Sequence, residues 1–163
     1  MRARLGSQDR HWLGVLRRYL VFAALAHFAW EAAQLPLYSI WLTRTAGELA
    51  FAVLHCTGGD LLIALSTMML ALLLFAGPDW PQAGTGRVLA AAILFGVGYT
   101  VFSEWLNITV RGAWAYRDLM PAIPGTGTGL SPFLQWIVVP AAAWSWAIGR
   151  WPGKAKPGEA PHG

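Results

Sequence analysis

The stretch that decides the fold is His27-Phe28-Ala29-Trp30-Glu31-Ala32-Ala33-Gln34-Leu35-Pro36-Leu37-Tyr38. It lies in a run of apolar residues long enough to cross a bilayer, yet it contains a histidine, a carboxylate and an amide. At about 100° per residue, its polar side chains fall within an arc of roughly 60° on one helix face: His27, Glu31, Gln34 and Tyr38. Ionisable groups inside a hydrocarbon span are costly and usually face the interior of a helix bundle. The stretch therefore predicts a transmembrane helix with one polar face.

The composition of the whole chain agrees with a membrane protein. Of its 163 residues, 56% are hydrophobic and only 12% are charged, whereas about 25% of residues are charged in soluble domains. The ten tryptophans suit a protein that is anchored at two membrane interfaces. Cys56 is the only cysteine, so the chain has no internal disulfide and no cysteine-based metal knuckle.

The positive charge is concentrated toward the two ends of the chain. The formal net charge is +4, and most of the cationic residues lie before or after the apolar region: Arg2, Arg4, Arg10, Arg17, Arg18, Arg150, Lys154 and Lys156. This distribution is typical of membrane topology signals rather than of a nucleic-acid-binding stripe, so we expect no nucleic acid partner. With an even number of spans, the positive-inside rule places both termini in the cytoplasm.

Four apolar segments predict an all-α, polytopic membrane protein with four antiparallel transmembrane helices, at about 19–39, 48–76, 87–109 and 131–149. They form a single domain over residues 1–150, followed by a basic tail, 151–163, that we expect to be disordered. Residues 1–18 suit a short interfacial lead-in to the first span. The alternative is a signal peptide cleaved after Ala24-Leu25-Ala26, which leaves open whether residues 1–26 are removed.

The buried polar groups fall at similar depths in this topology. With a rise of ~1.5 Å per residue, Glu31 and His55 lie roughly 10–12 Å below the outer surface, and His27 and Asp60 roughly 18 Å. Glu104 and Gln135 lie at roughly 7–8 Å by the same estimate. Polar groups that merely held helices together would scatter through both halves of the membrane, so this one-sided distribution predicts an outward-facing pocket.

Acid–base chemistry on a lipidic or isoprenoid ligand is the leading functional hypothesis for that pocket. A carboxylic acid in an apolar pocket can donate a proton, while a paired carboxylate can act as a base. The expected catalytic residues are Glu31, His55 and Glu104. The expected ligand pocket adds His27, Gln34, Asp60, Asn107, Trp114, Tyr116 and Gln135, with Trp114 and Tyr116 in a loop of about twenty residues that suits a lid or an interface anchor.

Three alternatives remain open at this level, and so does the question of whether the protein is an enzyme. A divalent metal such as zinc, iron or manganese suits the donor set His27, Glu31, His55 and Glu104. Proton-coupled transport would use the same histidine and carboxylates. In the third alternative, the polar groups only pair helices. The expected surroundings are the lipid bilayer and a lipidic small molecule, and homo-oligomers are compatible with the sequence.

Two local patterns resemble known membrane enzymes. His27-x-x-x-Glu31 together with Glu104 resembles the sterol-isomerase-type membrane fold, which implies a histidine and two glutamates in the site. Glu104, then Gly112-x-Trp114-x-Tyr116 and Pro132, is similar to membrane cyclases and hydratases of carotenoid synthesis, although an acidic pair at the start of the last span is missing. The chain also resembles a family of small bacterial inner-membrane proteins without an assigned activity, which implies that location.

Overall fold

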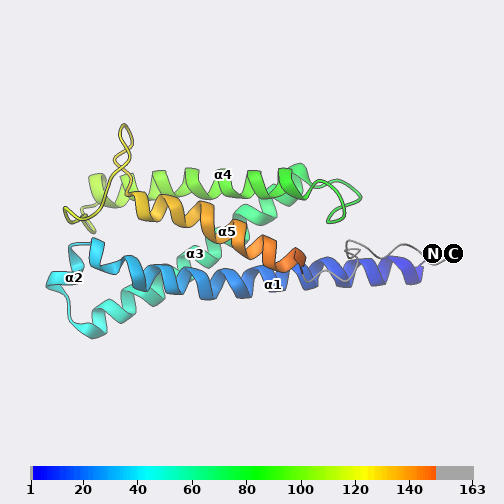
Figure 1. The fold of residues 1–163 in the computed structure, drawn as a ribbon, viewed down its shortest axis with the longest axis horizontal. Coiled ribbons are helices and arrows are strands. Elements are labelled where there is room, and N and C mark those ends of the chain that lie inside the picture. The colour runs from blue at the N-terminus through cyan, green and yellow to red at the C-terminus, as the bar shows by residue number, and fades with distance from the viewer. Residues whose placement is uncertain (1, 150–163) are drawn as a thin grey trace.

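The computed structural model describes residues 2–149, with side chains from Trp12 onward. This part of the chain forms four long helices, each antiparallel to the one before it (Figure 1): α1 (Arg2–Gln34), α3 (Ala46–Phe75), α4 (Thr85–Glu104) and α5 (Leu130–Gly149). Three short elements complete it: a 3₁₀ turn η1 (Leu35–Leu37), a one-turn helix α2 (Ile40–Thr43) and a π-helix η2 (Trp105–Val110) that continues α4. Helix α1 packs against α3 and α5, and α4 packs against the same two, so the long helices form a closed ring.

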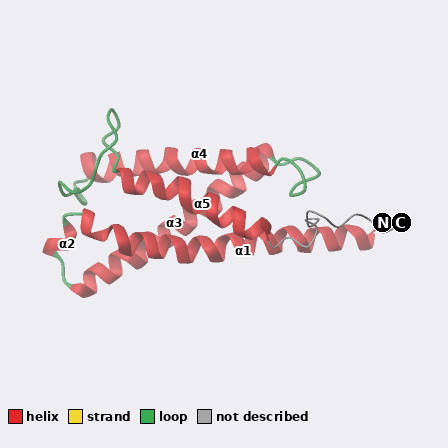
Figure 2. Cartoon of the chain, in the orientation of Figure 1, coloured by secondary structure: helices red, strands yellow, loops and turns green. Residues whose placement is uncertain are grey.

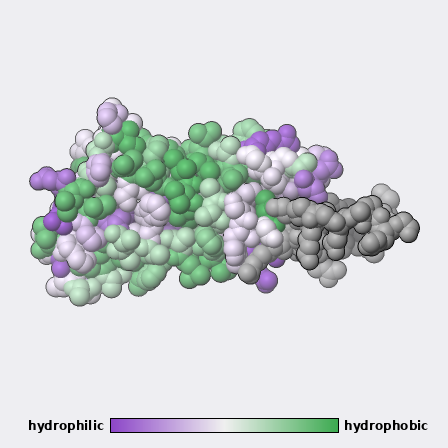
Figure 3. Space-filling view, viewed as in Figure 1, coloured by the Kyte–Doolittle hydropathy of each residue, from purple (hydrophilic) through white to green (hydrophobic). Residues whose placement is uncertain are grey.

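Three helical stretches among the described residues are long and apolar enough to cross a membrane, which is the mark of a membrane protein: Trp12–Leu37, Ala46–Phe75 and Thr85–Val110. Helix α5 is shorter, with 20 residues. Its hydropathy is lowered by Gln135, by two prolines and by three tryptophans. Its length and composition alone do not make it a fourth candidate span. Apolar residues cover the middle of the molecule, and polar residues gather toward the ends of the described part (Figure 3).

The helix bounds agree with the predicted spans except at the N-terminus. The expected interfacial lead-in is part of α1, and the candidate span begins at Trp12 rather than at residue 19. The reason is that Val15 and Tyr19, one helical turn apart, are both buried in the core, at 0% and 1% exposure. The expected disordered tail, 151–163, lies outside the described residues.

The apolar core occupies the half of the bundle that contains the start of α1 and the end of α5. It consists of Val15, Tyr19, Ala23, Met68, Ala71, Val88, Ala91, Ala92, Val139, Ala143, Trp144 and Ala147. An aromatic chain extends from it, in which the ring of Trp144 lies 6.2 Å from that of Tyr19 and 5.9 Å from that of Trp80. Because apolar packing fills this half, the buried polar groups collect in the other one.

The loop between η2 and α5 is fixed over the polar end of the bundle (Figure 2). The backbone N–H of Ser39 donates to Ala115 O at 2.9 Å, and that of Arg117 donates to Leu37 O at 2.9 Å. The Arg117 guanidinium adds a hydrogen bond of 2.7 Å to Pro36 O. The loop, residues 111–129, is therefore anchored to the end of α1 and covers this end of the bundle. It is called the roof below.

Candidate functional site

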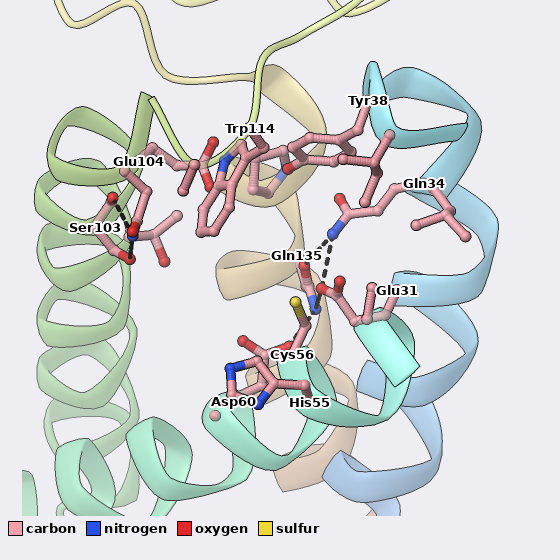
Figure 4. A pocket seen from close by; sticks show the side chains of 18 of the residues that line it. Glu31, Gln34, Tyr38, His55, Cys56, Asp60, Ser103, Glu104, Trp114 and Gln135 are labelled. Carbon is pink, nitrogen blue, oxygen red and sulfur yellow. Dashed lines mark hydrogen bonds between the residues drawn. The ribbon is translucent and has the colours of Figure 1, made fainter. Parts of the chain in front are cut away.

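A cavity of about 620 Å³ lies under this roof, with walls from all four long helices. In Figure 4, α1 supplies Glu31 and Gln34, α3 supplies His55, Cys56 and Asp60, and α4 supplies Ser103 and Glu104. Gln135 of α5 lies at the back, and Trp114 of the loop lies above. Four separate helices thus bring polar side chains to a single space within the bundle.

The side-chain amide of Gln135 is the centre of the polar network. Its Nε2 atom lies 3.1 Å from Glu31 Oε1, 3.0 Å from Asp60 Oδ2 and 2.9 Å from His27 Nδ1. An amide nitrogen has two hydrogens, so it can satisfy two of these three acceptors at once. Its Oε1 accepts a hydrogen bond from Gln34 Nε2 at 3.3 Å. One residue of α5 therefore links α1 to α3.

His27 lies next to both Gln135 and Asp60. Its Nδ1 atom is 2.9 Å from Gln135 Nε2 and 3.4 Å from Asp60 Oδ2, so it accepts from the amide in one tautomer and donates to the carboxyl group in the other. Its Nε2 atom is buried without a hydrogen-bond partner among the described residues. The side chain is 0% exposed and its ring lies 5.1 Å from that of Trp136. His27 thus supports the pocket from behind its wall.

The carboxyl groups of Glu31 and Asp60 meet at one atom, because Gln135 Nε2 lies 3.1 Å from Glu31 Oε1 and 3.0 Å from Asp60 Oδ2. Two carboxyl groups held this close together favour a shared proton, because two like charges at short range repel each other. Glu31 also accepts a hydrogen bond of 2.7 Å from Gln34 Nε2. The pair therefore places an acid and a base side by side, which is an arrangement that proton transfer uses.

A hydroxyl relay holds Gln34 in place. Ser131 Oγ donates to Gln34 Oε1 at 2.8 Å, and the indole of Trp30 donates to Ser131 Oγ at 3.1 Å. Ser131 lies one turn before Gln135 on α5, so one face of α5 contacts α1 twice: Ser131 bonds to Gln34, and Gln135 bonds to Glu31. The amide orientation of Gln34, and with it the donor to Glu31, is thereby set.

Glu104 lies on the α4 side of the cavity. Tyr116 donates its phenolic hydrogen to Glu104 Oε2 and accepts a hydrogen bond of 2.7 Å from the backbone N–H of Gly129. Burial, and then the hydrogen bond to Glu104, raises the pKa of the Tyr116 phenol above its ordinary value. The Trp114 indole also faces the Glu104 carboxyl group without closing a full hydrogen bond. Tyr116 thus fastens the roof to the wall.

The helix changes its winding immediately after Glu104. Residues Trp105–Val110 form the π-helix η2, and Arg111 N–H donates to Leu106 O at 2.9 Å in place of the α-helical pattern. Asn107 donates to the backbone and side-chain oxygens of Ser103, at 2.9 and 3.2 Å. π-Helical turns are frequent at functional sites. Here the turn lies in the pocket wall.

The mouth of the cavity is more exposed and carries opposite charges. Glu48 caps α3 through Thr45 and forms an ion pair with Arg44 at 3.0 Å, so its carboxylate is already engaged. Arg111 also lines the cavity and is exposed. His55 is exposed, and its ring stacks on Phe51 with 5.6 Å between ring centroids.

The structure brings most of the expected site residues to one cavity. Eight of the ten line it: Glu31, Gln34, His55, Asp60, Glu104, Asn107, Trp114 and Gln135. The other two, His27 and Tyr116, stand behind the wall and contact residues that line it. The roles assigned to them remain predictions.

The expected metal donors are not gathered. Among the residues described, no group of three or more His, Cys, Asp or Glu side chains is placed to hold a metal ion. His27 is hydrogen-bonded behind the wall, His55 is exposed and stacks on Phe51, and Glu104 is bonded to Tyr116. In this arrangement the candidates His27, Glu31, His55 and Glu104 do not converge on one point, and metal binding stays a prediction.

Several residues of the site were not on the expected list. Trp30 and Ser131 join the network, and Cys56 and Thr100 line the cavity. Helical spacing does place Ser131 on the face of Gln135 and Thr100 on the face of Glu104, one turn away in each case, although neither was assigned to the site. Cys56 lies next to His55 in an apolar helix, and nothing in its neighbours distinguishes it.

No family model, curated protein or solved structure matches this chain. Its site therefore has to be interpreted from the residues themselves. They define a helical membrane protein with a polar pocket at one end of the bundle.

Proposed function

We propose that this chain is a four-span protein of the bacterial inner membrane, with both termini in the cytoplasm, whose outward-facing pocket binds a lipid-soluble small molecule and acts on it by acid–base chemistry. The topology rests on the antiparallel ring of four long helices and on the basic ends of the chain. Helix α5 serves as the fourth span. At ~1.5 Å per residue, its 20 residues extend about 30 Å, the thickness of a hydrocarbon core.

The observation that carries the functional proposal is a cavity of about 620 Å³ lined both by carboxyl groups and by apolar and aromatic side chains. Ligand pockets typically occupy roughly 300–1,000 Å³ and combine an apolar wall with a few convergent polar groups. Purely structural helix pairing would leave no such space, because the polar groups would contact each other directly.

The carboxyl groups face the cavity from two sides, as Figure 4 shows. Glu104 stands on α4, and the Glu31–Asp60 pair stands across the space on α1 and α3. A ligand bound between them meets a group that can give a proton and a group that can take one. An isomerisation, hydration or cyclisation of an isoprenoid chain needs that combination, and aromatic faces such as that of Trp136 would stabilise a developing cation.

Proton-coupled transport is less well supported by the geometry. A transport path needs polar steps across the whole membrane. The buried core in the other half of the described bundle consists of apolar and aromatic side chains such as Val15, Met68 and Trp144. A pocket with access from one side suits binding or catalysis better.

Native mass spectrometry of the protein released from nanodiscs tests this function. We expect a bound lipid-soluble molecule on the wild-type chain and its loss from Glu104→Gln, which keeps an acceptor for Tyr116 but removes the ionisable group. The matched control is Asp79→Asn, an exposed carboxylate in the loop at the other end of the bundle. A wild-type chain without any adduct, or an adduct equally present in all three proteins, would overturn the proposal.

A further inference from the structure

The cavity reaches the lipid-facing surface of the bundle. Its walls include Phe51 of α3, with 68% of its surface exposed, and Tyr99 of α4, with 47% exposed. Both residues lie inside candidate membrane spans. In Figure 1, α3 runs obliquely across the bundle, and its N-terminal end diverges from α4. Exposed residues of both helices thus line the cavity on this side of the bundle.

His55 supports the same interpretation. It is an exposed polar ring within an apolar helix, and it stacks on Phe51 without a hydrogen bond to any other side chain of the described residues. A polar ring turned toward hydrocarbon is unfavourable. It is accommodated if the space in front of it is occupied by a polar group of a ligand on its way into the cavity.

The charged side chains that line the cavity indicate which polar head group a ligand would carry. Three carboxyl groups line the cavity, those of Glu31, Asp60 and Glu104. The cationic side chains that line the cavity are Arg44, which is engaged by Glu48, and the exposed Arg111. An ammonium group placed among these three carboxyl groups would donate charge-assisted hydrogen bonds to their oxygens. A cation bound there would also lie among the aromatic rings of Trp136, Tyr99 and Trp114, which favour positive charge.

We propose that the ligand is a membrane-dissolved amphiphile with a protonated amine head, and that it enters the cavity sideways from the bilayer, between α3 and α4. This inference rests on the proposed function and adds the ligand class and the route. The amine lies between Glu104 and the Glu31–Asp60 pair, and the alkyl chain extends past Phe51 into the lipid.

The ligand class is tested with three probes that share a chain length and differ in head group: dodecylamine, dodecanol and dodecanoate. Binding to the protein in nanodiscs is measured by native mass spectrometry and by thermal shift. We expect dodecylamine to bind at least about tenfold more tightly than dodecanol, and dodecanoate to bind least, because like charges repel at close range. If dodecanol or dodecanoate binds as well as the amine, the ligand class is wrong while the pocket proposal stands. If none of them binds and the wild-type chain carries no adduct, the pocket proposal fails.

The route is tested with a bulky residue at the opening. Ala52 of α3 lines the cavity beside Phe51, so Ala52→Trp should obstruct the passage between the helices. Leu73→Trp is the matched control, because Leu73 is 79% exposed on the same helix but lies in the other half. We expect Ala52→Trp to slow dodecylamine association about tenfold, with unchanged helicity and melting temperature, and Leu73→Trp to leave the rate unchanged.

Equal rates in both variants and the wild type would rule out the lateral route. If Ala52→Trp unfolds, Ala52→Leu replaces it and is held to the same criterion.

Discussion

Gln135 Nε2 on α5 lies 2.9 Å from His27 Nδ1 on α1, and the same nitrogen is within 3.0 Å of Asp60 on α3. Interhelical hydrogen bonds in membranes average only about 0.6 kcal/mol, so one such bond would contribute little. This amide is different because three acceptors, the fully buried His27 and the partly buried Glu31 and Asp60, share one donor group. Removing the amide leaves His27 Nδ1 and Asp60 Oδ2 without this hydrogen-bond donor.

Replacing that amide should therefore destabilise the bundle by more than an average hydrogen bond. For Gln135→Leu we expect a loss of about 1–3 kcal/mol, the cost of leaving buried polar groups unsatisfied. Unfolding in mixed micelles with increasing denaturing detergent measures it. The control is Gln82→Leu in the exposed loop before α4, which should stay close to wild type. Equal stability of the two variants would mean that the network does not hold the helices together.

The close contact between Gly96 of α4 and the ring of Trp136 on α5 also predicts a stability difference. A Cβ atom at Gly96 would overlap the indole, whereas a Cβ at Gly98 meets no atom within 4 Å. We expect Gly96→Ala to cost about 1–3 kcal/mol through overpacking. Gly98→Ala, two residues along the same helix, should be neutral or stabilising by up to about 1 kcal/mol. The same detergent titration compares them, and a neutral Gly96→Ala would show that the two helices can separate freely here.

The phenol of Tyr116 should control the mobility of the roof. Tyr116→Phe removes the donor to Glu104 and the acceptor for Gly129 N–H. We expect trypsin to cleave after Arg117 roughly fivefold faster, which corresponds to about 1 kcal/mol of lost local stability. Tyr99→Phe is the control, since Tyr99 lies on α4 away from the loop contacts. Unchanged cleavage of Tyr116→Phe would mean that the backbone bonds of the loop hold it without the phenol.

The raised pKa of the Tyr116 phenol predicts how its hydrogen bond to Glu104 responds to alkaline pH. Burial raises the pKa of Tyr116 above its ordinary value of 10.0. The stability contributed by the protonated phenol is then fully present below pH 10 and is lost as pH rises through the higher pKa of the folded state. Difference absorbance between wild type and Tyr116→Phe should show this tyrosine ionising above pH 10. Ionisation at or below pH 10 would contradict a buried, hydrogen-bonded phenol.

Part of this arrangement could be predicted from the sequence because apolar runs and helical spacing are local properties. The bounds of α3, of α4 with η2, and of α5 follow from them to within a few residues. Depth estimates from the rise per residue also placed His27 level with Asp60, and the two side chains lie 3.4 Å apart. Spacing within single helices was sufficient for these features.

Other features depend on how helices rotate and cross, which spacing within one helix does not specify. Helix α3 remains α-helical through Gly58-Gly59, so His55 and Asp60 point in different directions: His55 is exposed beside Phe51, and Asp60 contacts Gln135. This rotation is why the expected metal set did not assemble. The π-helix after Glu104 was also not foreseen, because its register depends on the contacts of the roof.

The four-span topology predicts which sites share a side of the membrane. In a Cys56→Ser background, single cysteines at Gln82, in the loop before α4, and at Gly149, the end of α5, should lie on one side. A cysteine at Thr126, in the roof, should lie on the other. In intact cells, a membrane-impermeant maleimide should label only Thr126→Cys, because the basic ends of the chain favour the cytoplasm. Labelling of Gly149→Cys together with Thr126→Cys would show that α5 returns without crossing, and the protein would then have three spans. Labelling of Gln82→Cys and Gly149→Cys without Thr126→Cys would keep four spans but invert the orientation, so that the pocket opens toward the cytoplasm.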